Sequence, residues 1–178
     1  MGKYHEVFML AFAGCQILDV AGPLQMFAGA NLELGREAYR LTVAAAEAGP
    51  FETSSGLRLV ADSAFSALTS RVWSATDTVI VAGGEGGTAA VAGVAELIAL
   101  VRAASLTDAR IVSICAGAFF LAAAGVLDGR QAATHWRAVE KLRAFRPAAP
   151  SMPRRCSSGT AMSGPRPGSR RGWIWRWR

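Results

Sequence analysis

With 178 residues, the chain is long enough for one domain with a core of its own. Hydrophobic residues make up 52% of the chain, but no uninterrupted apolar stretch reaches the roughly 18 residues of a membrane span. The N-terminal sequence lacks a secretory signal and a myristoylation motif. The net charge is +6, but residues 151–178 contain seven arginines and no acidic residue. Residues 1–150 therefore hold 12 basic and 13 acidic residues, and the basic character belongs to the tail.

Apolar and β-branched runs alternate with segments of helical periodicity over the first 145 residues. In chain order the patterns predict a strand over 4–13, a helix over 21–34, a strand over 39–47, a hairpin arm over 54–65, a strand over 77–87, a helix over 89–105, a strand over 109–114, a helix over 117–125, a short strand over 130–135 and a helix over 136–145. Buried strands that alternate with helices indicate an α/β sandwich with a mostly parallel sheet.

Three positions follow the carboxyl ends of predicted strands. Asp19 comes after the first strand, the pair Gly83 and Gly84 comes after "VIVA", and Cys115 comes after "IVSI". Ligands bind at this edge of parallel α/β sheets. The sequence therefore predicts that these residues share one site.

Cys115 lies in "SICAG", between a strand and a helix, where Gly117 gives room for a sharp turn. Such a turn would present the thiol at a helix N-terminus, where the helix dipole lowers the thiol pKa. The backbone N–H of Ala116, with one from the glycine loop, could then face a developing oxyanion. The pattern favours a nucleophile on a turn, and the alternative is a buried cysteine that only fills the core.

His135 and Asp19 each have a catalytic and a structural interpretation. His135 could be a base for the thiol of Cys115, or it could cap the start of the following helix, which the residues alone favour. Asp19 could be a general acid or base facing the thiol, or the N-cap of its helix. His5 lies within the first strand and is interpreted as incidental. The "AGGEGG" loop lacks both phosphate-binding glycine patterns, so its glycines are expected to permit close backbone approach.

Cysteine usage gives the expected compartment. Cys15, Cys115 and Cys156 are far apart and odd in number, which argues against a disulfide framework and against a zinc cluster. We expect a cytoplasmic protein with no metal, no cofactor and no membrane partner.

Four segments together resemble a known family: "ILDVAGPLQMF", "SSGLRLVAD", "VIVAGGEGG" and "SICAGAFFLAAAGVLDGRQAATHW". They are similar to the ThiJ/PfpI branch of the class I glutamine amidotransferase-like superfamily, over about residues 4–146, and the last segment is highly specific. Within this branch the closest resemblance is to the N-terminal domain of AraC-type transcriptional regulators, and isonitrile hydratase is a near relative. The resemblance implies a flavodoxin-like three-layer sandwich, usually a homodimer, with Cys115 on the turn.

The resemblance also implies roles for single residues. Asp19 corresponds to the acidic residue that faces the nucleophile in the hydratase. Gly84 and Ala116 match positions that supply oxyanion N–H groups, and His135 matches a histidine near the cysteine in several branches. The hydratase carries Thr directly after its cysteine, whereas this chain has Ala116, so a hydroxyl implicated in that chemistry is absent.

The sequence changes character beyond Phe145, where Pro, Gly, Ser and Arg dominate and the last residues read "WIWRWR". Family members continue instead with a strand pair, a "TSAG"-like loop and a helix. A permitted back-translation of 150–177, read two nucleotides along, gives "VDAEALFVRDGNVWTSAGVTAGMDLAL", which matches that continuation. We therefore expect an incomplete family domain over 1–147 and a disordered basic tail over 148–178, produced by a frameshift near 148–151.

Such a chain would have an unpaired sheet edge and an incompletely covered core, and would be prone to aggregate. The alternative interpretation of the tail is a genuine basic and aromatic patch for a membrane interface or single-stranded nucleic acid.

Three functions are compatible with these features. The favoured one is the domain of an AraC-type regulator that senses a small-molecule ligand, truncated before its DNA-binding domain. Because no helix-turn-helix pattern is present, DNA would be a partner only through that missing domain. The second is a cysteine-dependent hydratase or hydrolase of a small nitrogenous or carbonyl compound, which Ala116 weakens. The third is a redox or electrophile sensor that uses Cys115 as its thiol.

Overall fold

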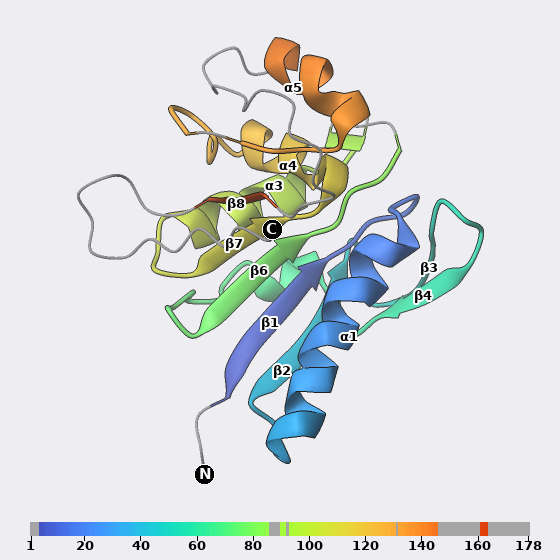
Figure 1. Cartoon of the computed structure of the whole chain (residues 1–178), viewed down its shortest axis with the longest axis vertical. Helices are drawn as coiled ribbons and strands as arrows, with labels where there is room; N and C mark the ends of the chain where they lie inside the picture. Colours follow the sequence, from blue (N-terminus) through green and yellow to red (C-terminus); the bar gives the residue numbers. More distant parts are fainter. Residues whose placement is uncertain (1–3, 86–89, 92, 131, 146–160, 164–178) are drawn as a thin grey trace.

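The computed structural model describes residues 4–85, 90–91, 93–130, 132–145 and 161–163. Its centre is a six-stranded sheet in the order β5-β2-β1-β6-β7-β8 (Figure 1). The strands are β1 (His5–Leu10), β2 (Tyr39–Ala45), β5 (Ser63–Ala64), β6 (Asp77–Val81), β7 (Arg110–Ser113) and β8 (Ala161–Ser163). All neighbours pair in parallel except β7 and β8. The predicted mostly parallel sheet is confirmed, within an α/β fold of the flavodoxin-like class.

The middle of the sheet is its most buried part. β6 is buried along its whole length, and the last four residues of β1 are buried too. Continuous apolar strands of this kind are typical of a parallel sheet covered on both faces. Phe8 of β1 is in register with Thr42 of β2 on one side and Val79 of β6 on the other. This register brings the carboxyl ends of β1, β6 and β7 to one edge.

Helices flank the sheet (Figure 1). α1 (Ile17–Leu34) packs against β2, whereas α3 (Ala95–Ser105) contacts β7, α4 (Ala118–Ala123) and the short helix η1 (Phe65–Leu68). Further helical elements of the described chain are η2 (Cys115–Gly117), η3 (Trp136–Ala138) and α5 (Val139–Phe145), which packs on α4. No helix in the described part of the chain is long and apolar enough to cross a membrane.

The predicted hairpin is confirmed as a separate two-stranded antiparallel sheet. It consists of β3 (Gly49–Glu52) and β4 (Arg58–Ala61), and it projects from the main sheet beside α1 (Figure 1). Gly14 N–H donates to the Glu52 carbonyl, and Ser54 N–H donates to the Cys15 carbonyl. These bonds tie the hairpin to the loop after β1.

Two predicted element boundaries were wrong. α1 begins at Ile17 rather than at 21, and Pro23 lies inside it, because the extra turn buries Asp19 and Val20. The segment 130–135 is not a strand over its described residues. Thr134 turns inward there instead, and its hydroxyl donates to the Cys115 carbonyl at 2.9 Å.

The tail was expected to be irregular, but three of its residues form β8. They pair antiparallel with β7, with Ile111 opposite Ser163 and Ser113 opposite Ala161. The other residues of 148–178, which include the "WIWRWR" motif and Cys156, lie outside the described residues.

Candidate functional site

The backbone turns sharply at Cys115. Ile114 is extended, Cys115 has φ 51°, and η2 and α4 follow directly. Cys115 is the only residue other than glycine with positive φ in the described part of the chain, in a region that side chains with a Cβ adopt at a cost. A Cβ at Gly117 would lie 2.5 Å from the Val81 carbonyl oxygen, so only glycine fits there. The predicted turn between strand and helix is therefore present.

The glycine loop after β6 lies against this turn. A Cβ at Gly83 would lie 2.7 Å from the Ala116 nitrogen and 2.8 Å from the Ile114 oxygen, and one at Gly84 would lie 2.9 Å from the Gly14 oxygen. The Gly83 carbonyl also accepts the N–H of Gln16 at 2.9 Å. The glycines thus permit close backbone approach, and Gly83 and Ala116 are brought together at the edge of the sheet.

Asp19 reaches the same place from the first turn of α1. Its carboxylate accepts the Gly83 N–H at 3.0 Å, and only 9% of the residue is exposed. The N-cap position of α1 belongs to Gln16, so the N-cap interpretation of Asp19 is wrong. Burial raises the pKa of Asp19, and the Gly83 N–H and the nearby His135 partly oppose the rise.

The thiol of Cys115 does not have the lowered pKa that the sequence predicted. Burial raises the pKa of Cys115, the negative charge of Asp19 raises it further, and the Ala116 N–H lowers it. The prediction relied on a helix dipole, but the turn leads into a three-residue η2 and a six-residue α4. So short a helix has few aligned peptide dipoles to offset burial and a neighbouring carboxylate.

His135 has the capping role that the residues alone favoured. It is the N-cap of η3, and its Nδ1 accepts the Arg137 N–H at 3.4 Å. The side chain of His135 is exposed, and it also lines the pocket that contains Cys115.

His5 lies at the opposite end of the sheet, where its Nε2 is 2.7 Å from the Thr78 hydroxyl. It takes no part in the site.

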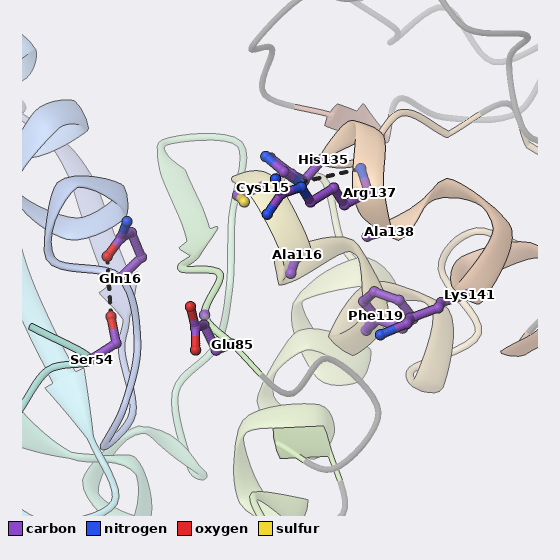
Figure 2. Close-up of a pocket in the computed structure, with 11 residues that line it drawn as sticks. Gln16, Ser54, Glu85, Cys115, Ala116, Phe119, His135, Arg137, Ala138 and Lys141 are labelled. Atoms are coloured by element: carbon purple, nitrogen blue, oxygen red, sulfur yellow. Dashed lines mark hydrogen bonds between the residues drawn. The ribbon is translucent and has the colours of Figure 1, made fainter.

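Cys115 opens onto a pocket of about 450 Å³ (Figure 2). This volume lies in the range of pockets for small molecules. The pocket is lined by Gln16, Ser54, Gly84, Glu85, Cys115, Ala116, Phe119, His135, Arg137, Ala138 and Lys141.

Several of these residues escaped the sequence analysis. Gln16 and Ser54 come from the loop after β1 and from the hairpin, and the Ser54 hydroxyl donates to the Gln16 side chain at 3.1 Å. Arg137 and Lys141 carry the one available signal, a basic face on the predicted last helix. Nothing in the sequence indicated that this face meets the cysteine. Among the described residues, no three His, Cys, Asp or Glu side chains cluster as a metal ion would require.

Fold and site together define an α/β protein with a cysteine at a strand-to-helix turn, an acidic residue of α1 that accepts a hydrogen bond from the glycine loop beside it, and a pocket of about 450 Å³ in front of the cysteine. The chain belongs to the DJ-1/PfpI family, which its sequence matches over residues 5–151.

The chain is also similar to individual known proteins. A Streptomyces lividans protein, known by its position in the cpoL 5′ region, is 37% identical over 133 residues, which cover 75% of this chain and 89% of that protein. A crystal structure of a ThiJ/PfpI family protein from Pseudomonas syringae is 26% identical, with a TM-score of 0.66; the match covers 80% of this chain and 55% of that protein, so the chain spans about half of its length.

An AraC family transcriptional regulator from Pseudomonas putida is similar in fold. It is 22% identical, with a TM-score of 0.65, and the match covers 85% of this chain and 77% of that structure.

The charge of Asp19 should control the reactivity of Cys115. In Asp19→Asn the carboxylate that raises the pKa of Cys115 is removed, so that pKa should fall and more thiolate should form at a given pH. The measurement is the rate of Cys115 alkylation by iodoacetamide against pH, followed by peptide mass spectrometry. The midpoint should move to lower pH.

Glu85→Gln is the matched control, because it removes a pocket carboxylate that does not shift the Cys115 pKa. Its midpoint should equal that of the unmodified chain. Equal midpoints for Asp19→Asn and the unmodified chain would contradict the expectation.

Proposed function

We propose that this chain is the ligand-sensing domain of an AraC-type transcriptional regulator, in which Cys115 marks the binding site for a small molecule. The observation that carries the proposal is the placement of Cys115, at φ 51° on a strand-to-helix turn, in the wall of a pocket of about 450 Å³. Two features favour binding over catalysis. Burial and Asp19 raise the pKa of Cys115, which keeps the thiol protonated near neutral pH, and Ala116 offers no hydroxyl.

The second candidate is a cysteine-dependent hydratase or hydrolase, in which the turn at Cys115 is a nucleophile elbow. Asp19, held on Gly83 N–H beside the thiol, favours it, because a buried acid with a raised pKa could exchange a proton with a substrate. The backbone around Gly83, Gly84 and Ala116 could supply oxyanion donors. With an isonitrile, the Cys115 sulfur bonds to the terminal carbon while the thiol proton passes through Asp19 to the same carbon, which gives a thioimidate. Water then adds to that carbon, the C–S bond breaks, the sulfur regains a proton, and the product is a formamide.

Cys115→Ala separates the two functions. The unmodified chain and the variant are incubated with an alkyl isonitrile and with a primary amide, and product formation and thermal melting are both measured. A sensor should show no turnover in either form, and any compound that binds should still raise the melting temperature of the variant. Turnover that disappears in Cys115→Ala would overturn the sensor in favour of the enzyme.

We also propose that the domain forms a homodimer through α1. Leu18, Met26 and Leu32 are 69%, 70% and 80% exposed on this helix. Gly22 and Gly29 lie on the same face, and a Cβ at either would meet nothing within 4 Å. Leu57 and Val60 of the adjacent hairpin are exposed as well. This exposed face of α1 carries apolar side chains and two glycines together with Gln25 and Glu33, and a mixed surface of this kind suits packing on a second copy of itself.

Met26→Glu should dissociate this dimer, because a carboxylate on each copy would be buried against the other. Light scattering during size-exclusion chromatography measures the mass in solution. Val72→Glu is the control, because Val72 is 88% exposed and lies outside α1 and the hairpin. A dimer that survives Met26→Glu, or a chain that is monomeric from the start, would contradict the assignment.

The tail over 148–178 is, in this proposal, out of frame, and the regulator's DNA-binding domain lies in the displaced frame downstream. The match to the DJ-1/PfpI family extends only to residue 151, which is where the displaced frame would begin. The nucleotide sequence from codon 140 onward decides the point. It should encode a "TSAG"-like loop and two helix-turn-helix units once one frame change is applied. A frame without such sequence downstream would overturn the truncation.

A further inference from the structure

The pocket above Cys115 has an uneven distribution of charge. Arg137 of η3 and Lys141 of α5 are four residues apart, a spacing that places both on one face of a helix. Both line the pocket, and in Figure 2 they lie on the opposite side from Gln16 and Ser54. Glu85 is the single carboxylate in the lining. Two cationic side chains and one anionic side chain therefore face the space in front of Cys115.

The two cationic groups are not neutralised within the described part of the chain. Neither Arg137 nor Lys141 forms an ion pair with a carboxylate there, whereas Arg143, on the same helix, pairs with Glu140 at 2.9 Å. The Arg137 guanidinium lies over the Trp136 ring, 4.8 Å from its centre. This cation–π contact restricts the guanidinium without using its hydrogen-bond donors.

The rest of the pocket is mixed in character. Phe119, Ala116 and Ala138 provide apolar surface, and the hydrogen-bonded pair of Gln16 and Ser54 provides polar groups on the far side. An apolar wall suits a compact organic molecule rather than an inorganic ion. The lining carries two cations and one carboxylate, and the Asp19 carboxylate is buried beside Cys115 outside the lining. The anionic group of a ligand is therefore matched best next to Arg137 and Lys141.

We propose that the ligand class of this pocket is a small organic carboxylate, whose anionic group lies between Arg137 and Lys141 while its other end faces Cys115. The inference rests on the proposed function, because it takes the pocket at Cys115 as the site where the ligand binds. It adds the charge of the ligand and names the two side chains that select it. Guanidinium and ammonium groups are the usual partners of a carboxylate in proteins.

A pair of alkylating reagents tests this directly. Iodoacetate and iodoacetamide have the same reactive carbon, and in both the thiolate sulfur of Cys115 displaces iodide and forms a thioether. They differ only in the charge that the pocket is proposed to recognise. The ratio of their rate constants at Cys115 is independent of the fraction of thiolate, because both reagents need the same thiolate. Peptide mass spectrometry of the full chain separates Cys115 from Cys156 and from the fully buried Cys15.

The ratio of iodoacetate to iodoacetamide should exceed the ratio for 2-mercaptoethanol, an uncharged thiol, by about three- to fourfold at low ionic strength. This is the size expected for one net unit charge at roughly 5–6 Å in a solvent-like dielectric, because Glu85 offsets one of the two cations. The ratio should fall toward the 2-mercaptoethanol value at high salt. The double variant Arg137→Gln with Lys141→Gln should lose the preference. The control Arg143→Gln, on the same helix but outside the pocket, should keep it.

Labelling by both reagents with the 2-mercaptoethanol ratio, unchanged in the double variant, would overturn the carboxylate preference and leave an accessible Cys115 pocket in place. Failure of both reagents to label Cys115 at alkaline pH, where a thiol with a raised pKa also ionises, would overturn the pocket as a site open to small solutes, and with it the proposed function. Loss of the preference in the Arg143→Gln control would show a long-range charge effect and would overturn the assignment to Arg137 and Lys141.

Discussion

Close contact between backbones at one edge of the sheet is the constraint on which the site depends. The turn after β7 lies against the carboxyl end of β6, where the Val81 oxygen occupies the space that a Cβ at Gly117 would need. The loop after β6 in turn lies against Ala116, and Gly83 leaves room for it. Asp19 is then held on the Gly83 N–H. Because these contacts involve main-chain atoms, they fix the position of Cys115 more firmly than side-chain packing would, and they hold it at a φ that a cysteine rarely adopts.

Sequence reasoning located this edge but not the electrostatics of the site. Buried apolar runs mark where the strands end, and parallel strands place their carboxyl ends at one edge, so the sequence alone brings Asp19, Gly83 and Cys115 together. It does not yield the sign of the Cys115 pKa shift, because that sign depends on burial and on which way Asp19 points. Residues such as Ser54 and Lys141 reach the pocket only through tertiary packing of the hairpin and α5. Their sequence patterns are those of ordinary surface residues.

The surroundings of Cys115 favour the protonated thiol over the reactive thiolate. A cysteine under attack by oxidants or electrophiles is vulnerable in proportion to its thiolate fraction, and the Asp19 carboxylate and partial burial both reduce that fraction. A sensor gains from such protection, because its pocket stays chemically intact while it binds and releases ligand. The same pair becomes an acid and a nucleophile if a bound compound neutralises Asp19 or displaces water.

The short strand β8 has a consequence for how such chains tolerate change. A sheet edge recognises an incoming strand through amide and carbonyl groups, which every residue except proline provides in full. The contact of Ala161–Ser163 with β7 is therefore largely indifferent to which amino acids occupy it. A change of the side chains in this segment would leave the main-chain pairing with β7 available.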